Sequence, residues 1–342
     1  MEYPMSFKHA AKTSLEDVSA VGFTHFGIAG AVTSLSSERD ETFLIDAKSD
    51  GRYILKIAHP DERLDFLAFQ TAALLHLAEA DKALPVPQVV ASSVGPMVVL
   101  PFADGSTRIV RALTFLDGTQ LYKAPRSKVQ MHNLGRALAQ LDASLSTFAA
   151  VMPKQDLLWD MTNAFDLVRL VEHTEPSRQK MVLNVLDAFH ALSTGKLQCV
   201  PRQVIHNDFN PHNILVSDSD PSLISGIIDF GDVVEAARIN DVAVALSYQI
   251  GAVEGLSDCI ALLRGYQQTL QLQHDEIDCL PALLRTRMVM TLVISEWRAE
   301  AHPDNRDYIL RNHPLALAGL TALSDYTDSD LARLFRRELG DL

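Results

Sequence analysis

The order of apolar and polar residues changes along the chain, and its first part is typical of β-strands. Segments 42–47 and 52–57 are rich in apolar residues, and Asp50-Gly51 between them favours a hairpin turn. After Pro60, apolar residues recur three and four positions apart, which predicts a helix that begins at this proline. Segments 85–90 and 109–116 are predicted to be further strands.

Beyond Asp117-Gly118 the pattern becomes helical. Apolar residues repeat at helical spacing over 134–145, 157–171 and long stretches of 239–301. Short apolar strands interrupt this pattern on either side of polar loops, at 204–205, 214–216 and 224–228. The pattern therefore predicts an α+β plan with a β-rich N-terminal lobe over 1–116, a hinge near 111–117 and a mainly helical C-terminal lobe over 117–342.

Composition narrows the class of protein. The chain has 342 residues, 47% of them hydrophobic, which is enough for two lobes. Its 30 Lys and Arg against 43 Asp and Glu give a net charge of −13, which argues against a nucleic-acid or anionic membrane partner. Cys199, Cys259 and Cys279 have no metal-ligand spacing, and no secretory signal or apolar span is visible, so a cytoplasmic location is expected. No feature of the sequence indicates an oligomeric state.

The candidate chemistry lies in His206-Asn-Asp-Phe-Asn-Pro-His-Asn213 and in Ile227-Ile-Asp-Phe-Gly231. An Asp, an Asn five residues later and an Asp-Phe-Gly after a short strand form the phosphoryl-transfer pattern of kinases. In that reaction a carboxylate orients the acceptor hydroxyl and takes its proton, which is the role expected of Asp208. Hard oxygen ligands must hold Mg²⁺, so Asn213 and Asp229 are the expected metal ligands. His206 is expected to brace the loop.

These residues resemble the aminoglycoside phosphotransferase and choline kinase superfamily, over nearly the whole chain. The resemblance implies a two-lobe, protein kinase-like fold and ATP or GTP as the phosphoryl donor. It also implies the parts of the nucleotide site: a phosphate-covering first hairpin with Ser36 and Ser37, a strand lysine at Lys56, and a hinge that recognises the base through backbone groups near Thr114 and Phe115. Asp241 resembles the acidic residue that anchors the catalytic segment.

Two positions depart from the family pattern. The position aligned with the helix glutamate that partners the strand lysine is Ala68, so Lys56 is expected to pair with Asp65 or Glu62 instead. Asn207 stands where relatives commonly have glycine, and its side chain is expected to point to solvent. Loss of the helix glutamate leaves a nucleotide-binding pseudokinase regulator as an alternative function from a different class.

The acceptor is inferred from the branch of the family. His-x-Asp-x-Asn-x-His-Asn-Ile-Leu followed by Ser-Gly-Ile-Ile-Asp-Phe-Gly-Asp is most similar to the hydroxylysine kinase branch, so 5-hydroxylysine is the favoured acceptor. An aminoglycoside, choline, ethanolamine or homoserine acceptor remains an alternative. An ammonium-bearing amino acid requires carboxylates and a cation, and Arg238 is a further candidate for the cation. The candidate acceptor-binding residues are Asp232, Glu235, Glu296, Trp297 and Arg298, with core packing as the alternative role of Trp297.

Overall fold

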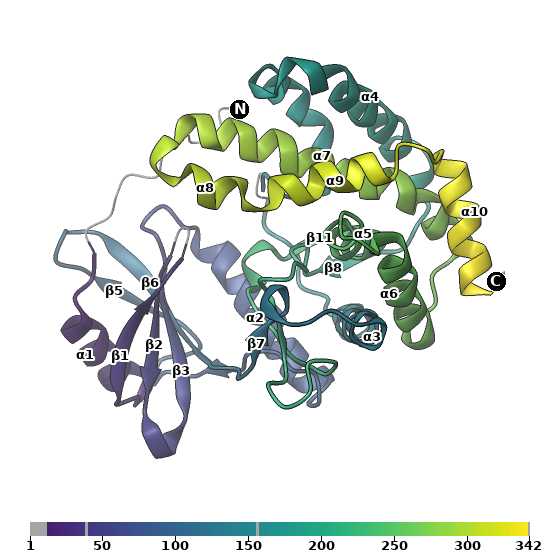
Figure 1. The fold of residues 1–342 in the computed structure, drawn as a ribbon. Coiled ribbons are helices and arrows are strands. Elements are labelled where there is room, and N and C mark those ends of the chain that lie inside the picture. The colour runs from purple at the N-terminus through teal and green to yellow at the C-terminus, as the bar shows by residue number, and fades with distance from the viewer. Residues whose placement is uncertain (1–11, 38–39, 155–156, 341–342) are drawn as a thin grey trace. The chain divides into compact units, whose positions relative to one another are not determined.

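The computed structural model describes residues 12–37, 40–154 and 157–340. The chain divides into two compact units. The first contains residues 1–117 and 150–153, and the second contains residues 118–149 and 154–342 (Figure 1). Within the described residues, no helix is both long and apolar enough to cross a membrane.

The first unit is an antiparallel sheet with two helices, α1 (Leu15–Phe26) and α2 (Leu64–Ala80). The strand order is β1-β2-β3-β6-β4, with β5 also paired to β6. Their bounds are β1 Ala31–Leu35, β2 Glu41–Asp46, β3 Arg52–Ile57, β4 Val89–Val90, β5 Val98–Pro101 and β6 Thr107–Thr114. Alternate residues of β2, β3 and β6 form one apolar core with Val18 and Phe26 of α1. On the other face, Arg111 of β6 contacts Gln70 of α2.

Two predicted elements of the first unit differ from the structure at their ends. The helix begins at Leu64 rather than Pro60, because a turn in which the Glu62 amide donates to the His59 carbonyl comes first. Of the predicted strand 85–90, only Val89–Val90 pairs in the sheet. Pro85 and Pro87 lack an amide donor, so they cannot extend the ladder.

The second unit is mainly helical. Its helices are α3 Lys128–Leu145, α4 Pro176–Ser193, α5 Ile239–Ser247, α6 Gly255–Thr269, α7 His274–Ala301, α8 Arg306–Ile309, α9 His313–Ala322 and α10 Asp328–Leu339. Most of α7 is buried, and α4, α5, α9 and α10 pack around it (Figure 1). The segment predicted as a helix over 157–171 is instead a 3₁₀ helix, Met161–His173. Its start is delayed because Asp160 caps the Thr162 amide at 2.8 Å.

Helices α3 and α6 approach each other closely through glycines. A Cβ atom on Gly135 would lie 1.9 Å from the Leu262 carbonyl oxygen, and one on Gly265 would lie 1.9 Å from the His132 carbonyl oxygen. Neither position can accept a side chain without moving a backbone, so these glycines determine the distance between the two helices.

Two short antiparallel sheets hold the polar loops of the second unit. Strands β10 (Ile224–Ile227), β9 (Ile214–Val216) and β7 (Thr119–Gln120) form one, and β11 (Val234–Ala237) pairs with β8 (Arg202–Ile205) in the other. The loop from β8 to β9 carries His206 to Asn213, and the segment after β10 carries Asp229. The predicted motif therefore lies on loops between buried strands.

Candidate active site

The loop that carries Asp208 is held by its own polar groups. The Asn210 amide donates to the Asp208 carbonyl at 2.8 Å, and the Asn213 amide donates to the Asn210 carbonyl at 3.0 Å. The Asn210 side-chain oxygen accepts from the His212 amide at 2.8 Å. Asn and Asp side chains favour such local bonds to the backbone, which is why this polar sequence forms a defined turn.

Asp208 is partly exposed, and a buried arginine stabilises its charge. Its side chain is 23% exposed, and one carboxylate oxygen, Oδ2, accepts from the Asn213 side-chain amide at 2.7 Å. The Nη2 atom of Arg287 lies 3.5 Å from the other oxygen, Oδ1. Burial raises the pKa of Asp208 to about 6, and the Arg287 guanidinium opposes this rise. The carboxylate is thus accessible and is kept ionised by a buried cation.

Asp229 has a strained backbone at the end of β10. Its φ of 63° and ψ of 76° lie in the left-handed region, which an aspartate adopts at a cost, and its side chain is exposed. The preceding Ile228 amide donates to the Asn213 carbonyl at 2.8 Å, so the two expected metal ligands are connected through the backbone. Because the Asn213 amide nitrogen donates to Asp208, its side-chain oxygen is left as an acceptor.

His206 is buried and serves as a brace. Its Nε2 atom lies 3.1 Å from the Ile228 carbonyl, and its Nδ1 atom accepts from the Asp208 amide at 3.3 Å. Burial lowers the pKa of His206 to about 4, so the ring is neutral, with one nitrogen donating and the other accepting. The expectation that His206 supports the loop through hydrogen bonds is confirmed.

A buried carboxylate anchors the start of the loop. Asp241 of α5 accepts from the His206 amide at 2.8 Å and from the Asn207 amide at 2.7 Å. A second buried carboxyl, Asp142 of α3, hydrogen-bonds to Asp241 and accepts from the Tyr266 hydroxyl at 2.7 Å. Burial raises the pKa of Asp241 to about 6 and that of Asp142 further, so one proton is shared by the pair, with Asp142 as its main holder.

The expectation for Asn207 was wrong. The residue is 1% exposed, and its side-chain nitrogen donates to the Trp159 carbonyl at 3.4 Å. Its φ of 66° explains why glycine suits this position, since glycine adopts left-handed backbone without strain and asparagine tolerates it.

Arg287 lies on α7, far from the motif in sequence, and was not among the predicted site residues. It is 1% exposed, stacks over the Trp159 ring at 5.0 Å and donates to the Trp159 carbonyl at 2.9 Å. Its Nε atom has no hydrogen-bond partner among the described residues. A fully buried arginine requires an anionic partner, but burial is not visible in the sequence. Because α7 also carries Arg285 and Arg298, its residues alone do not single out Arg287.

In the first unit, Lys56 lies on β3 directly between Thr42 of β2 and Arg111 of β6. Directly opposed residues project from the same face of a sheet, so two cations lie side by side. Asp65 forms an ion pair with Arg63 at the exposed start of α2, and Glu62 lies in the turn before it. The pairing of Lys56 with Asp65 or Glu62 stays a prediction. Because Asp65 is already paired with Arg63, Glu62 is the favoured partner of Lys56.

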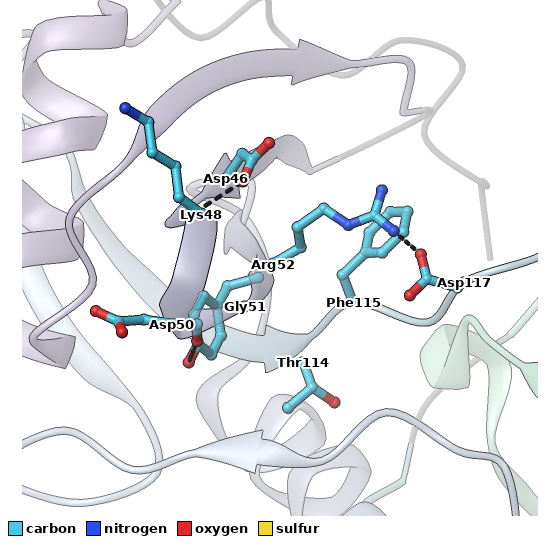
Figure 2. Close-up of a pocket in the computed structure, with 9 residues that line it drawn as sticks. Asp46, Lys48, Asp50, Gly51, Arg52, Thr114, Phe115 and Asp117 are labelled. Carbon is cyan, nitrogen blue, oxygen red and sulfur yellow. Dashed lines mark hydrogen bonds and ion pairs between the residues drawn. The ribbon is translucent and has the colours of Figure 1, made fainter.

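The predicted hairpin and hinge residues of the nucleotide site lie at opposite ends of the strands of this sheet. Ser36 and Ser37 are exposed after β1, while Glu38 and Arg39 of the same hairpin lie outside the described residues. Thr114 and Phe115 line a polar hollow of about 580 Å³, where the Arg52 guanidinium covers the Phe115 ring at 4.4 Å (Figure 2). The Thr114 and Phe115 amides donate to the Gln88 and Arg52 carbonyls, both at 2.9 Å. Base recognition near this hinge would therefore use the carbonyl groups of these residues or the segment that follows.

The candidate acceptor-binding residues are dispersed over the second unit. Asp232 follows Asp-Phe-Gly, and Glu235 is exposed on β11. Glu296 is bound by Arg178 and by His313, whose Nε2 atom lies 2.6 Å away. Trp297 is 8% exposed, as expected for core packing, whereas Arg298 is partly exposed.

The contacts of Arg238 disfavour the role suggested for it. It forms a buried ion pair with Glu276 and donates to the Gln271 carbonyl at 3.1 Å. Because Arg238 is 8% exposed and its charge is already matched by a carboxylate, it is poorly suited to bind a second carboxylate.

The sheet-containing first unit, the helical second unit and the Asp208 loop define a kinase-like phosphotransferase with a hydroxyl acceptor. A family model described as "Phosphotransferase enzyme family" matches residues 31–277, and the chain belongs to this family.

Individual relatives have low sequence identity to the chain. The chain is 25% identical over 319 residues to a hydroxylysine kinase from Danio rerio, with 89% of each chain covered. It is 28% identical over 234 residues to a homoserine kinase from Rhizobium etli (strain CIAT 652), covering 64% of this chain and 65% of that one.

Solved structures share the fold. A microcompartment-associated aminopropanol kinase has a TM-score of 0.72 at 20% identity, covering 93% of this chain and 99% of that one. The amicoumacin kinase hAmiN, in complex with AMP-PNP and Ca²⁺, has a TM-score of 0.67 at 17% identity, covering 87% and 92%. The α+β, protein kinase-like fold predicted from the sequence is confirmed.

Proposed function

We propose that this small-molecule kinase transfers the γ-phosphoryl group of ATP or GTP to the hydroxyl of an amino-bearing metabolite, with 5-hydroxylysine as the favoured acceptor. The observation that carries the proposal is the partly exposed Asp208 carboxylate, held by Asn213 and Arg287. The hydroxylysine kinase relatives support the choice of acceptor.

Asp208 acts on the acceptor. Its exposed carboxylate orients the hydroxyl and accepts its proton as the oxygen attacks the γ-phosphorus and the bond to the leaving nucleoside diphosphate breaks. Arg287 holds this carboxylate from beneath, so one orientation is already set before the acceptor binds.

Asn213 and Asp229 are suited to hold Mg²⁺. The Asn213 side-chain oxygen is left as an acceptor by the bond from its nitrogen to Asp208, and the Asp229 carboxylate is exposed. No group of three or more His, Cys, Asp or Glu side chains suited to a metal lies within the described residues, so phosphate and water oxygens would complete the coordination. When bound, the ion would neutralise charge on the transferring phosphoryl group.

The donor would be held by the first unit. Lys56 supplies a cation for the phosphates, Ser36 and Ser37 supply hydroxyls and amides, and the segment at Thr114 and Phe115 recognises the base. In the second unit Asp232, Glu235 and Arg298 remain proposed acceptor contacts. Glu296 would bind the ammonium group of an acceptor only if it released Arg178 and His313.

A phosphotransfer screen tests the function. ATP and GTP are each supplied with Mg²⁺ and with 5-hydroxylysine, homoserine, 3-aminopropanol, ethanolamine, choline or kanamycin, and nucleoside diphosphate release is measured. We expect 5-hydroxylysine to give the highest kcat/KM and Asp208→Asn to abolish the signal. Homoserine is the second candidate, because homoserine kinases also match the chain. Nucleotide binding without turnover of any acceptor would favour the pseudokinase alternative and contradict the proposal.

A further inference from the structure

A second arginine lies near the catalytic loop, on the segment between α8 and α9. Arg311 belongs to the 3₁₀ turn Leu310–Asn312, which contacts α7, the helix that also carries Arg287 (Figure 1). Its guanidinium stacks over the Tyr308 ring at 3.9 Å, and its Nη1 atom donates to the Tyr308 carbonyl at 2.9 Å. The side chain is exposed, yet these two contacts fix its direction.

The turn that carries Arg311 contacts the catalytic loop. The side chain of Asn312 hydrogen-bonds to His212, and the His212 ring packs against Tyr122 at 4.3 Å. The charge of Arg311 acts on His212 and also on Tyr248, whose hydroxyl hydrogen-bonds to Arg287. Arg311 is therefore within electrostatic range of His212 on the loop that carries Asp208 and of Tyr248, a partner of Arg287.

Among the residues that the structure describes, no carboxylate forms an ion pair with Arg311. Arg287 is buried beneath Asp208 and Arg238 is paired with Glu276, so neither presents a guanidinium to solvent in this region.

We propose that Arg311 binds the carboxylate of the acceptor and thereby makes the enzyme prefer hydroxy amino acids to amino alcohols. The proposal rests on the proposed function, since it concerns the acceptor bound at Asp208. A guanidinium forms two parallel hydrogen bonds to a carboxylate, and Tyr308 leaves the Nη2 and Nε donors of Arg311 available. The distinction matters because the relatives include both hydroxylysine kinases and an aminopropanol kinase.

The test uses acceptors that differ only in the carboxylate. The pairs are 5-hydroxylysine with 1,5-diaminopentan-2-ol, and homoserine with 3-aminopropanol. For Arg311→Gln we expect KM for the hydroxy amino acid to rise about 10- to 100-fold, the effect of losing a charge-assisted bond. We expect kcat, the nucleotide KM and kcat/KM for the decarboxylated partner to stay unchanged. Arg311→Lys should restore part of the affinity, and Arg306→Gln, an exposed arginine on α8, is the matched control.

The outcomes distinguish a failure of this inference from a failure of the proposed function. An equal loss with both members of a pair, a change in the nucleotide KM, or no change at all would overturn the role of Arg311 while the wild-type enzyme still phosphorylates its acceptor. If the wild-type enzyme phosphorylates no member of either pair, the proposed function fails and this inference fails with it.

Discussion

The shared proton of Asp142 and Asp241 has a measurable effect on stability. The Oδ1 atom of Asp142 is buried with no donor among the described residues, and its neighbour is the Asp241 carboxylate. A proton on Asp142 that is donated to Asp241 satisfies both groups. We therefore expect Asp142→Asn, which has the shape of the neutral acid, to fold with little loss of stability. Asp241→Asn should cost about 2–3 kcal/mol or more, because an amide has one acceptor oxygen for two backbone donors.

The pH dependence follows from where the proton is bound. The unfolded Asp142 carboxyl ionises near pH 4, whereas the native pKa is raised well above that value. Because the native state binds a proton that the unfolded chain has lost, wild-type stability falls as pH rises between these two pKa values, by about 1.4 kcal/mol per pH unit. Asp142→Asn has no such proton. From about pH 5 upward, the free energy of unfolding of the variant should therefore rise relative to wild type by that amount per unit, until the pH reaches the native pKa of Asp142.

Tryptophan fluorescence during urea unfolding provides the assay. The chain has two tryptophans, and both Trp159 and Trp297 lie in the second unit, so their signal reports this unit alone. Tyr266→Phe is the control, since it should cost about 1–3 kcal/mol at every pH and leave the wild-type slope. Parallel pH curves for wild type and Asp142→Asn between pH 5 and 6 would refute the reasoning.

Four further substitutions test the site and its support. Asp208→Asn should lower kcat by about 10²–10⁴-fold with unchanged thermal stability; near wild-type turnover would remove its role as base. Asp229→Ala should abolish Mg²⁺-dependent nucleotide binding in calorimetry, and unchanged affinity would place the metal elsewhere. Arg287→Met should lower kcat by about 10²-fold and leave the nucleotide KM nearly unchanged, because Asp208 loses the side chain that orients it. A change in the nucleotide KM alone would argue against this role. Gly265→Ala should destabilise the protein by at least about 1–3 kcal/mol in urea, since its Cβ would overlap the His132 carbonyl; a neutral result would show that α3 and α6 can separate freely.

The catalytic segment was predictable because its chemistry is local in sequence. Asp208 and Asn213 lie on one short loop between apolar strands, and both the pattern of the strands and the polar loop are visible in the residues. The α+β division was predictable for a similar reason, since the period of apolar residues changes near Asp117.

Contacts between distant segments were not predictable. The pairing of Asp142 with Tyr266 joins two separate helices, and that of Asp208 with Arg287 joins a loop to a helix distant in sequence. Nothing in a single helix pattern shows that a polar residue will be buried, because burial depends on which helices pack together. Asn207 shows the same limit: its backbone suits glycine, but only the neighbouring Trp159 carbonyl explains why its side chain is buried.

The left-handed backbone of Asp229 has a consequence for evolution. Folding alone would favour glycine or asparagine at this position, since both adopt such a backbone at lower cost. Selection for stability and selection for activity therefore act in opposite directions at one residue. A descendant that no longer needed catalysis would be expected to lose this aspartate early and to become more stable as it did so. If Asp229 holds the metal as proposed, its presence here is what continued selection for activity would maintain.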